Sequence, residues 1–495
     1  MISVEAKKHD NFSVEFKFGF NCVHDGVKDD FAVNAWIFVP NSLDINPENY
    51  GESQFYRDIK SNVRLITPVY KLREMAQEDS LPLKSLTSAL HNVARNPCDQ
   101  LAVDAYEYHL KMFAAIFKSA LRDKAKVLLE ALPDASDLIE RYVARTQNVL
   151  SRFRALYEII DTPEVPAKLK NNFRMSDEFM SHVMEVRTIS LIKRIDSFKN
   201  TSFEQMRSRL VGMVADEHAY RDRVNFKMLN GEPKRDRELL HHYGMLKKYT
   251  ESELYIKLDK KKDGVALQQI YYSLAAGVAM VFATAVSWYY QEKYGSVTWP
   301  LFVVLVVSYM LKDRIKDLLR YCFAHKLGNK YYDKKATIAV GKTKVGSIKE
   351  GFDFVSDSKI PAEVKALRDK ASFIDEESDI FEEKVMLYRQ RAVLDDKALA
   401  LNDKYPRTGL NEIMRLHLYR FVQKMDNPQM AVDTLDDDGN LSQLIVQKIY
   451  YVNVVFQLVH DGEIQYKLFR IGMSRDGVFE VKKIDNQFNI YHGNH

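Results

Sequence analysis

The sequence of 495 residues has few cysteines and no strong excess of either charge. Its three cysteines, Cys22, Cys98 and Cys322, lie far apart, so they form neither a disulfide framework nor a thiolate metal site. The 72 basic and 68 acidic residues leave a net charge of +4, which gives no basis for nucleic-acid binding. We therefore predict a protein of a reducing compartment, built from two or three folded units, without a nucleic-acid partner.

The beginning of the chain lacks the apolar run of a secretory signal. Residues 1–10 instead carry four charged side chains: Glu5, Lys7, Lys8 and Asp10. Any insertion into a membrane would then depend on an internal segment.

Recognisable catalytic motifs are also absent, including G-x-S-x-G, H-E-x-x-H and the spacings of zinc ligands. Residues 341–343 resemble the end of a phosphate-binding loop, but Ala336 stands where that loop requires a glycine. Asp461, Glu480 and Lys482 resemble the metal-binding residues of some nucleases, yet Asp461 falls in a predicted turn. We predict no cofactor and no metal site, and the sequence leaves open whether the chain is an enzyme.

The most informative feature present is a pair of uncharged runs near the middle of the chain. Residues 264–291 form a run of 28 and residues 294–311 a run of 18, separated only by Glu292 and Lys293. At about 1.5 Å per residue, helices of these lengths would measure roughly 42 and 27 Å, against a hydrocarbon core of about 30 Å. We predict a two-helix transmembrane hairpin over residues 264–311. Because the second run is richer in leucine, phenylalanine and valine, we expect it to drive insertion.

The residues around the two runs predict that both ends of the hairpin lie on the cytoplasmic side. Basic residues are dense before the first run and after the second, while the connecting loop has only Lys293, as the positive-inside rule requires. The absence of a targeting peptide favours a bacterial inner membrane. The residues predicted to anchor the hairpin at the membrane surface are Lys260, Lys261, Lys262, Lys312, Arg314, Lys316, Arg320, Trp288 and Trp299.

Small side chains recur at every fourth position of the first run, at Ala275, Ala279, Ala283 and Ser287. Such a ladder allows another helix to approach closely. Packing against the second helix of the same hairpin is the favoured interpretation, and a contact between copies in a homo-oligomer is the alternative. No ionisable residue lies inside either run, which disfavours a channel or transporter.

Before the hairpin, the sequence predicts strands followed by helices. Alternating apolar residues over 13–20 and an apolar stretch over 31–39 predict a β-hairpin, and residues 63–70 a third strand. Apolar residues spaced by four and three over 139–160 form a heptad seam. An intramolecular helical bundle and a coiled coil both explain this seam.

After the hairpin, a basic amphipathic helix and then an antiparallel β meander are predicted. Asp-Gly pairs at 438–439, 461–462 and 476–477 favour tight turns between apolar strands. The predicted strands are 384–393, 413–422, 445–459, 464–471 and 478–484. The predicted regions are an N-terminal α+β region (1–97), a helical bundle or coiled coil (98–262), the hairpin (264–311), a basic juxtamembrane helix (312–335) and a C-terminal β-rich domain (336–495).

Together these patterns predict an α+β membrane protein with cytoplasmic domains on both sides of a helical hairpin. The lipid bilayer is the predicted partner, with a homo-oligomer and an unidentified protein as further candidates. The favoured function is a membrane-anchored binding, scaffold or sensor protein. The alternatives are a tethered enzyme or effector with a site of scattered residues, and an oligomerising effector that perturbs membranes.

Overall fold

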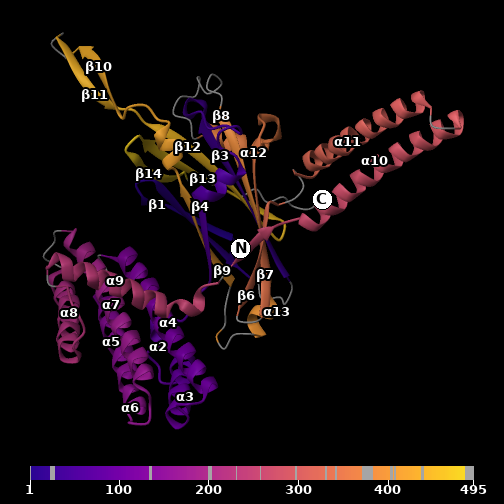
Figure 1. Ribbon diagram of the computed structural model, residues 1–495. Coiled ribbons are helices and arrows are strands. Elements are labelled where there is room, and N and C mark those ends of the chain that lie inside the picture. The colour runs from indigo at the N-terminus through magenta and orange to yellow at the C-terminus, as the bar shows by residue number, and fades with distance from the viewer. Residues whose placement is uncertain are drawn as a thin grey trace. The chain divides into compact units, whose positions relative to one another are not determined.

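The protein is a mixed α+β chain with antiparallel sheets, as seen in a computed structural model (Figure 1). It divides into two compact units. The β unit comprises residues 1–63, 256–402 and 409–495, and the helical unit comprises residues 64–255 and 403–408. The structure describes residues 2–22, 28–132, 136–198, 203–229, 231–256, 258–295, 298–328, 332–340, 343–370, 383–401, 405, 409–435 and 440–484.

Two sheets form the body of the β unit. The smaller sheet has the strand order β1-β2-β9-β4, and the larger has the order β14-β13-β12-β3-β8-β7-β6-β5. The smaller sheet contains β1 (Ile2–Asp10), β2 (Ser13–Asn21), β9 (Gly409–His417) and β4 (Ile59–Leu65). The larger contains β14 (Gly477–Ile484), β13 (Glu463–Ser474), β12 (Tyr450–His460), β3 (Lys28–Pro40), β8 (Glu383–Asp395), β7 (Thr343–Val355), β6 (Lys334–Val340) and β5 (Asp259–Lys262).

Strands from the two ends of the chain pair within both sheets. β2 pairs with β9, and β3 lies between β8 and β12. The N-terminal region (1–97) and the C-terminal domain (336–495) expected from the sequence therefore contribute to one body, because each supplies strands that complete the other's hydrogen bonding.

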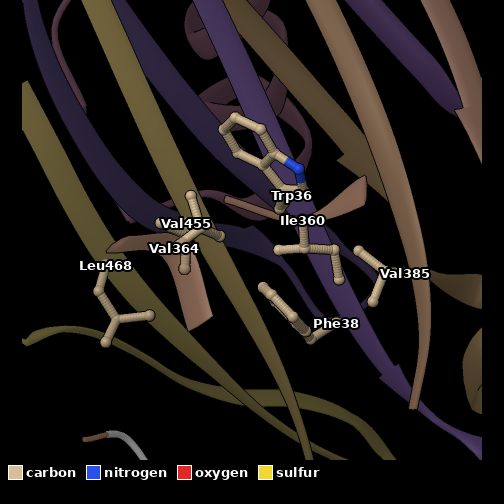
Figure 2. Packing of buried hydrophobic residues seen from close by; sticks show 7 residues of the cluster. All are labelled: Trp36, Phe38, Ile360, Val364, Val385, Val455 and Leu468. Carbon is tan, nitrogen blue, oxygen red and sulfur yellow. The ribbon is translucent and has the colours of Figure 1, made fainter. Parts of the chain in front are cut away.

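The core of the β unit is built on β3, which buries side chains on both faces. Phe31, Val33, Ala35, Ile37 and Val39 alternate along one face. The other face carries Trp36 and Phe38, which pack beneath helix α12 (Ala362–Asp369), as Figure 2 shows. Their neighbours in this cluster are Ile360, Val364, Val385, Val455 and Leu468. Because both faces of β3 are covered, its sequence is a nearly continuous run of apolar residues.

The sequence placed most strands, but 13–20 and 31–39 do not pair as the expected β-hairpin, because β2 lies in the smaller sheet and β3 in the larger. The expected strand 63–70 corresponds to β4, which already ends at Leu65. The expected strand 413–422 ends at His417, and a helical turn α14 (Tyr419–Gln423) follows because it buries Phe421 and Val422. The expected strand 445–459 is interrupted and belongs to both β11 (Leu441–Gln447) and β12. β11 pairs with β10 (Gln429–Leu435) in a separate two-stranded ribbon.

Two of the three predicted Asp-Gly turns join consecutive strands of the meander β12-β13-β14. Asp461 and Gly462 have φ values of 50° and 80°, and Gly477 has a φ of 122°. These positive values explain the residue choice, because asparagine, aspartate and glycine tolerate the left-handed region best. The pair 438–439 lies outside the described residues, as do residues 341–342.

Helices of the helical unit pack on one another through the expected apolar spacings. Phe153 of α5 stacks on Phe113 of α4 and Phe173 of α7, with ring centroids 5.4 and 4.5 Å apart. The heptad seam over 139–160 is divided, since α5 ends at Ala155. The helices are α2 (Leu72–Met75), α3 (Leu81–Arg95), α4 (Gln100–Ala131), α5 (Ser136–Ala155), α6 (Tyr157–Ile160), α7 (Ala167–Asp196), α8 (Glu204–Val224) and α9 (Pro233–Thr250).

Two 30-residue helices, α10 (Val265–Tyr294) and α11 (Trp299–Gly328), run side by side (Figure 1). Of the basic segment expected as a separate helix over 312–335, residues 312–328 form the second half of α11, whereas Lys334 and Lys335 belong to β6. The remaining helices of the β unit are α1 (Glu52–Asp58) and α13 (Asp396–Leu401).

Candidate functional site

The exposed apolar surface of α10 is the most unusual surface of the chain. Within this helix, residues 269–293 are long and apolar enough to cross a membrane, and only 11% of the most apolar stretch is buried. Among the described helices it alone meets these criteria. A core helix of a soluble protein would be mostly buried, so the exposure argues against that explanation. Its most exposed large side chains are Ile270, Leu274, Met280, Val281, Trp288 and Tyr289.

The second helix has a shorter apolar part than the sequence suggested. Gly295, with a φ of 64°, ends α10, and α11 begins only at Trp299. The uncharged part of α11 is therefore residues 299–311, about 20 Å of helix. The helix expected to drive insertion thus has the shorter apolar part, and it does not meet the criteria for a membrane span that α10 meets.

The small-residue ladder lies along the hairpin's own packing face. Ala275 and Ala279 are fully buried, and Ala283 and Ser287 are half-buried. A homo-oligomer contact through these positions would require α10 and α11 to separate. Homo-oligomerisation therefore remains a prediction that this feature does not strengthen.

Some of the residues predicted to anchor the hairpin at the membrane surface are exposed, and others contact neighbouring side chains. Trp288 and Trp299 are 72% and 76% exposed. On α11, Arg314 is exposed, Lys312 lies over the ring of Tyr309 at 3.7 Å, and Lys316 pairs with Asp313 at 3.0 Å.

One contact sets the register of the hairpin. The guanidinium of Arg320 lies 5.3 Å from the ring centroid of Tyr272. Because the helices are antiparallel neighbours, the charged residues 312–320 of α11 lie roughly level with residues 272–280 of α10.

The three lysines before the hairpin belong to strand β5, where their roles differ. Lys261 and Lys262 are exposed, as expected, but Lys260 Nζ pairs with Glu350 Oε1 at 2.7 Å. Glu350 is buried, so the ammonium of Lys260 serves to neutralise an internal carboxylate rather than to face lipid. Neighbouring residues of a strand point to opposite faces, which explains the different orientation of Lys260 and Lys261.

A polar cluster lies beside this pair in the interior of the β unit. Glu412 of β9 is fully buried and accepts hydrogen bonds from Ser61 Oγ and from Gln390 Nε2, the latter at 2.6 Å. Gln390 lies directly opposite Glu350 in the pairing of β7 and β8. Two buried carboxyl groups, Glu350 and Glu412, thus both neighbour Gln390, and the ammonium group of Lys260 pairs with the first of them.

Burial, and then the nearby charge of Glu350, raises the pKa of Glu412 to about 7. Glu412 can therefore exchange a proton near neutral pH. Gln390 Oε1 is buried without a hydrogen-bond partner among the described residues. Rotation of this amide would let it accept the proton of a neutral Glu412. Neither Glu412 nor Gln390 belongs to a motif, so no sequence pattern could identify them.

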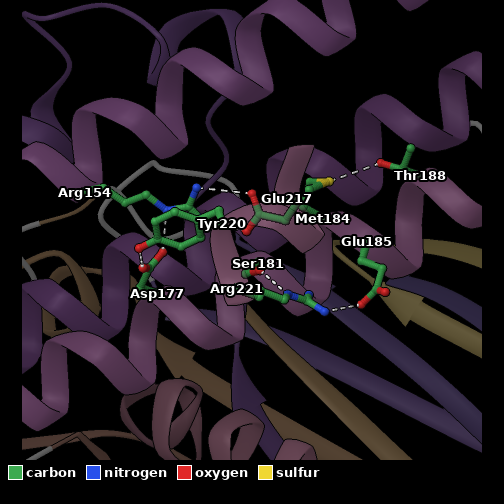
Figure 3. A network of polar contacts seen from close by, with 9 residues as sticks. All are labelled: Arg154, Asp177, Ser181, Met184, Glu185, Thr188, Glu217, Tyr220 and Arg221. Atoms are coloured by element: carbon green, nitrogen blue, oxygen red, sulfur yellow. Dashed lines mark hydrogen bonds and ion pairs between the residues drawn. The ribbon is translucent and has the colours of Figure 1, made fainter. Parts of the chain in front are cut away.

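A second buried network holds three helices of the helical unit together (Figure 3). Arg154 of α5 donates to Asp177 of α7 at 2.9 Å and to Glu217 of α8 at 2.5 Å. Its guanidinium also stacks on the ring of Tyr220, 3.4 Å from the centroid. Arg221 donates to Ser181 at 2.6 Å and to Glu185 at 2.7 Å.

Each carboxylate of this network faces a guanidinium, although Arg221 Nη2 is buried without a hydrogen-bond partner among the described residues. Burial opposes ionisation of Glu185, but hydrogen bonds from His182 and His218 and the charge of Arg221 lower the pKa of Glu185 to about 2. Burial raises the pKa of Asp177, although Arg154 opposes this. Satisfied internal ion pairs fix the packing of helices more than they signal catalysis.

The β10-β11 ribbon is a second exposed apolar surface. Its register places Met430 opposite Val446 and Val432 opposite Leu444, so these four side chains share one face. The opposite face carries Ile445, Leu435 and Leu441, and all of these side chains are exposed. Two strands with apolar residues on both faces are marginally stable alone, and soluble proteins rarely leave such surfaces exposed.

The nuclease-like residues do not form a site. Asp461 lies in the turn before β13, whereas Glu480 pairs opposite Gly472 near the other end of that strand. Glu463, next to this turn, and Gly472 are nine residues apart along the strand, a distance of roughly 30 Å.

No known family model, curated protein or solved structure matches this chain.

Proposed function

We propose that this chain is a membrane-anchored scaffold or sensor protein, with the α10-α11 hairpin as its anchor. The observation that carries the proposal is the length of apolar helix that α10 exposes. Soluble proteins rarely leave a contiguous apolar surface of this kind uncovered. A bilayer covers it without any further protein surface, and the exposed tryptophans at the connected ends suit a lipid interface.

The hairpin enters the membrane from one side and returns, so both termini lie on the same, cytoplasmic face. The uncharged residues 265–291 of α10 measure about 40 Å, enough to cross. The uncharged part of α11 measures about 20 Å, so Lys312 and Arg314 must extend their side chains to the headgroups. Local thinning of the bilayer would supply the remaining distance.

The β10-β11 ribbon is the surface through which the scaffold binds a protein. Its apolar faces could suit lipid as well, but the sequence that connects β10 and β11 contains three consecutive aspartates at 436–438, whose charges oppose entry into a bilayer. A partner that adds a strand to a free edge would cover both the edge and the apolar side chains.

Flotation of the full-length protein with vesicles of phosphatidylethanolamine and phosphatidylglycerol tests the anchor. The wild type should float and resist alkaline carbonate. The double variant Val281→Asp/Val306→Asp places a carboxylate on each apolar helix, at about 2.5–3.5 kcal/mol each, and should remain in the soluble or aggregated fraction.

The matched control is Val186→Asp/Val211→Asp, which changes two exposed valines on α7 and α8 and should float like the wild type. A wild-type protein that is monodisperse in water without detergent and ignores vesicles would contradict the proposal. Dye release from the same vesicles would instead favour the membrane-perturbing effector.

Photocrosslinking in cells tests the ribbon. A crosslinking residue at Leu444 should form a discrete protein adduct, and one at the exposed Glu480 of β14 should not. An adduct with lipid at Leu444 would show that the ribbon faces the membrane.

A further inference from the structure

Three potential metal ligands converge at the turn between β12 and β13, far from the hairpin in sequence. His460 Nε2 lies 3.2 Å from Asp29 Oδ1 and 3.2 Å from Asp461 Oδ2. One ligand atom of each residue lies within 4.8 Å of the others. Asp29 and His460 are buried, whereas the side chain of Asp461 is 62% exposed.

The backbone fixes all three side chains. His460 is the last residue of β12 and pairs opposite Phe31 of β3. The two rings stack with centroids 4.4 Å apart and planes 8° from parallel, which sets the direction of Nε2. Asp461 takes a φ of 50° in the two-residue turn, and this turns its carboxylate back towards the imidazole.

A simple ion pair explains this arrangement poorly. The single N–H that Nε2 can carry cannot donate well to two carboxylates at once. Asp29 is only 6% exposed, and its Oδ2 atom is buried without a hydrogen-bond partner among the described residues. Within the same described part of the chain, neither carboxylate pairs with a lysine or arginine. The cluster therefore keeps an excess of negative charge beside an unsatisfied buried oxygen.

The spacing fits a shared cation. In tetrahedral coordination with bonds of 2.0–2.1 Å, ligand atoms lie roughly 3.3 Å apart, close to the two distances from His460 Nε2. An imidazole nitrogen with two carboxylate oxygens favours zinc over magnesium or calcium, which prefer oxygen ligands alone. We propose that Asp29, His460 and Asp461 bind Zn²⁺, with the exposed side of Asp461 leaving a coordination position open to water.

Sequence spacing could not reveal this site. Asp29 and His460 are 431 residues apart, and they meet only because β3 and β12 are neighbours in the larger sheet. For this reason we predicted no metal site from the sequence. Bound zinc would link the start of β3 to the β12-β13 turn.

The test uses the full-length protein in detergent, stripped of metal by a chelator and titrated with Zn²⁺ against a chromophoric competitor. The wild type should bind one equivalent that His460→Gln and Asp29→Asn weaken at least roughly tenfold. Asp476→Asn is the matched control, because Asp476 precedes Gly477 in the next Asp-Gly turn of the meander without belonging to the cluster. It should bind like the wild type.

Thermal unfolding provides an independent measurement should Asp29→Asn fold poorly. Zn²⁺ should raise the melting temperature of the wild type and of Asp476→Asn, and should leave that of His460→Gln unchanged. Equal zinc affinity in the wild type and His460→Gln would place the metal elsewhere and overturn the proposal. So would a wild type that binds no zinc in the competition assay.

Discussion

Replacing Glu412 with glutamine should remove most of the pH dependence of stability of the β unit between about pH 5 and 8. The pKa of Glu412 is about 7 in the folded protein, against an ordinary value of 4.5. The folded state therefore binds the proton more tightly than the unfolded chain does. The stabilisation due to this proton is complete below pH 4.5 and is lost as the pH rises through 7.

The magnitude follows from the size of the pKa shift. A difference of about 2.5 pH units corresponds to roughly 3 kcal/mol, at 1.36 kcal/mol per unit. Because Glu412 is fully buried, solvent screening does not reduce this value much. The wild type should thus lose about 3 kcal/mol between pH 5 and pH 8 relative to Glu412→Gln, in which the side chain stays neutral.

Urea unfolding at several pH values, followed by tryptophan fluorescence, measures this difference. Trp36 reports on the β unit because it lies in the core cluster of Figure 2. Glu5→Gln is the control, since Glu5 lies on β1 and is well exposed, and it should leave the pH profile unchanged. Identical pH profiles for the wild type and Glu412→Gln would refute the reasoning, as would a wild type that gains stability relative to this variant as the pH rises.

Other substitutions probe packing and backbone geometry. Arg154→Leu leaves two buried carboxylates unpaired and should destabilise the helical unit by about 3–5 kcal/mol in urea unfolding, while Arg207→Leu, which removes a surface pair, should have little effect. Gly409→Ala should lower the free energy of unfolding by more than about 3 kcal/mol, because the φ of Gly409 is 144° and a Cβ would lie 1.9 Å from a carbonyl oxygen. Gly462 has a φ of 80° but open space around it, so Gly462→Ala should lower the free energy of unfolding by only about 1–2 kcal/mol in the same urea assay. Leu468→Ala should cost about 2–5 kcal/mol through the cavity it leaves in the core cluster, measured by thermal unfolding.

The local pattern of apolar residues was sufficient to predict a helix or strand where one face of that element packs on the core. The alternation of Val14, Phe16, Phe18 and Phe20 predicted β2, and all four side chains are buried. The same reasoning misjudged where elements end. The residues between Gly295 and Trp299 carry no charge and so extended the second apolar run, whereas α11 begins only at Trp299.

Pairing between distant segments was beyond the reach of local pattern. The residues around Glu412 in the sequence do not indicate that Ser61 and Gln390 donate hydrogen bonds to it, because the three residues lie on separate strands of two sheets. The same applies to Asp29 and His460. The exposed apolar helices could be predicted because their apolar residues are consecutive in the sequence. The buried polar clusters could not, because their residues come together only in the folded protein.

The placement of β3 between β8 and β12 has a consequence for biosynthesis. β3 ends at Pro40, and its neighbours begin only at Glu383 and Tyr450. At about 5–20 residues per second, a ribosome needs roughly 20–70 s to produce the first neighbour. During that interval the nascent chain carries a strand destined for burial on both faces. We therefore expect synthesis to depend on a chaperone that shields this segment until the last quarter of the protein emerges.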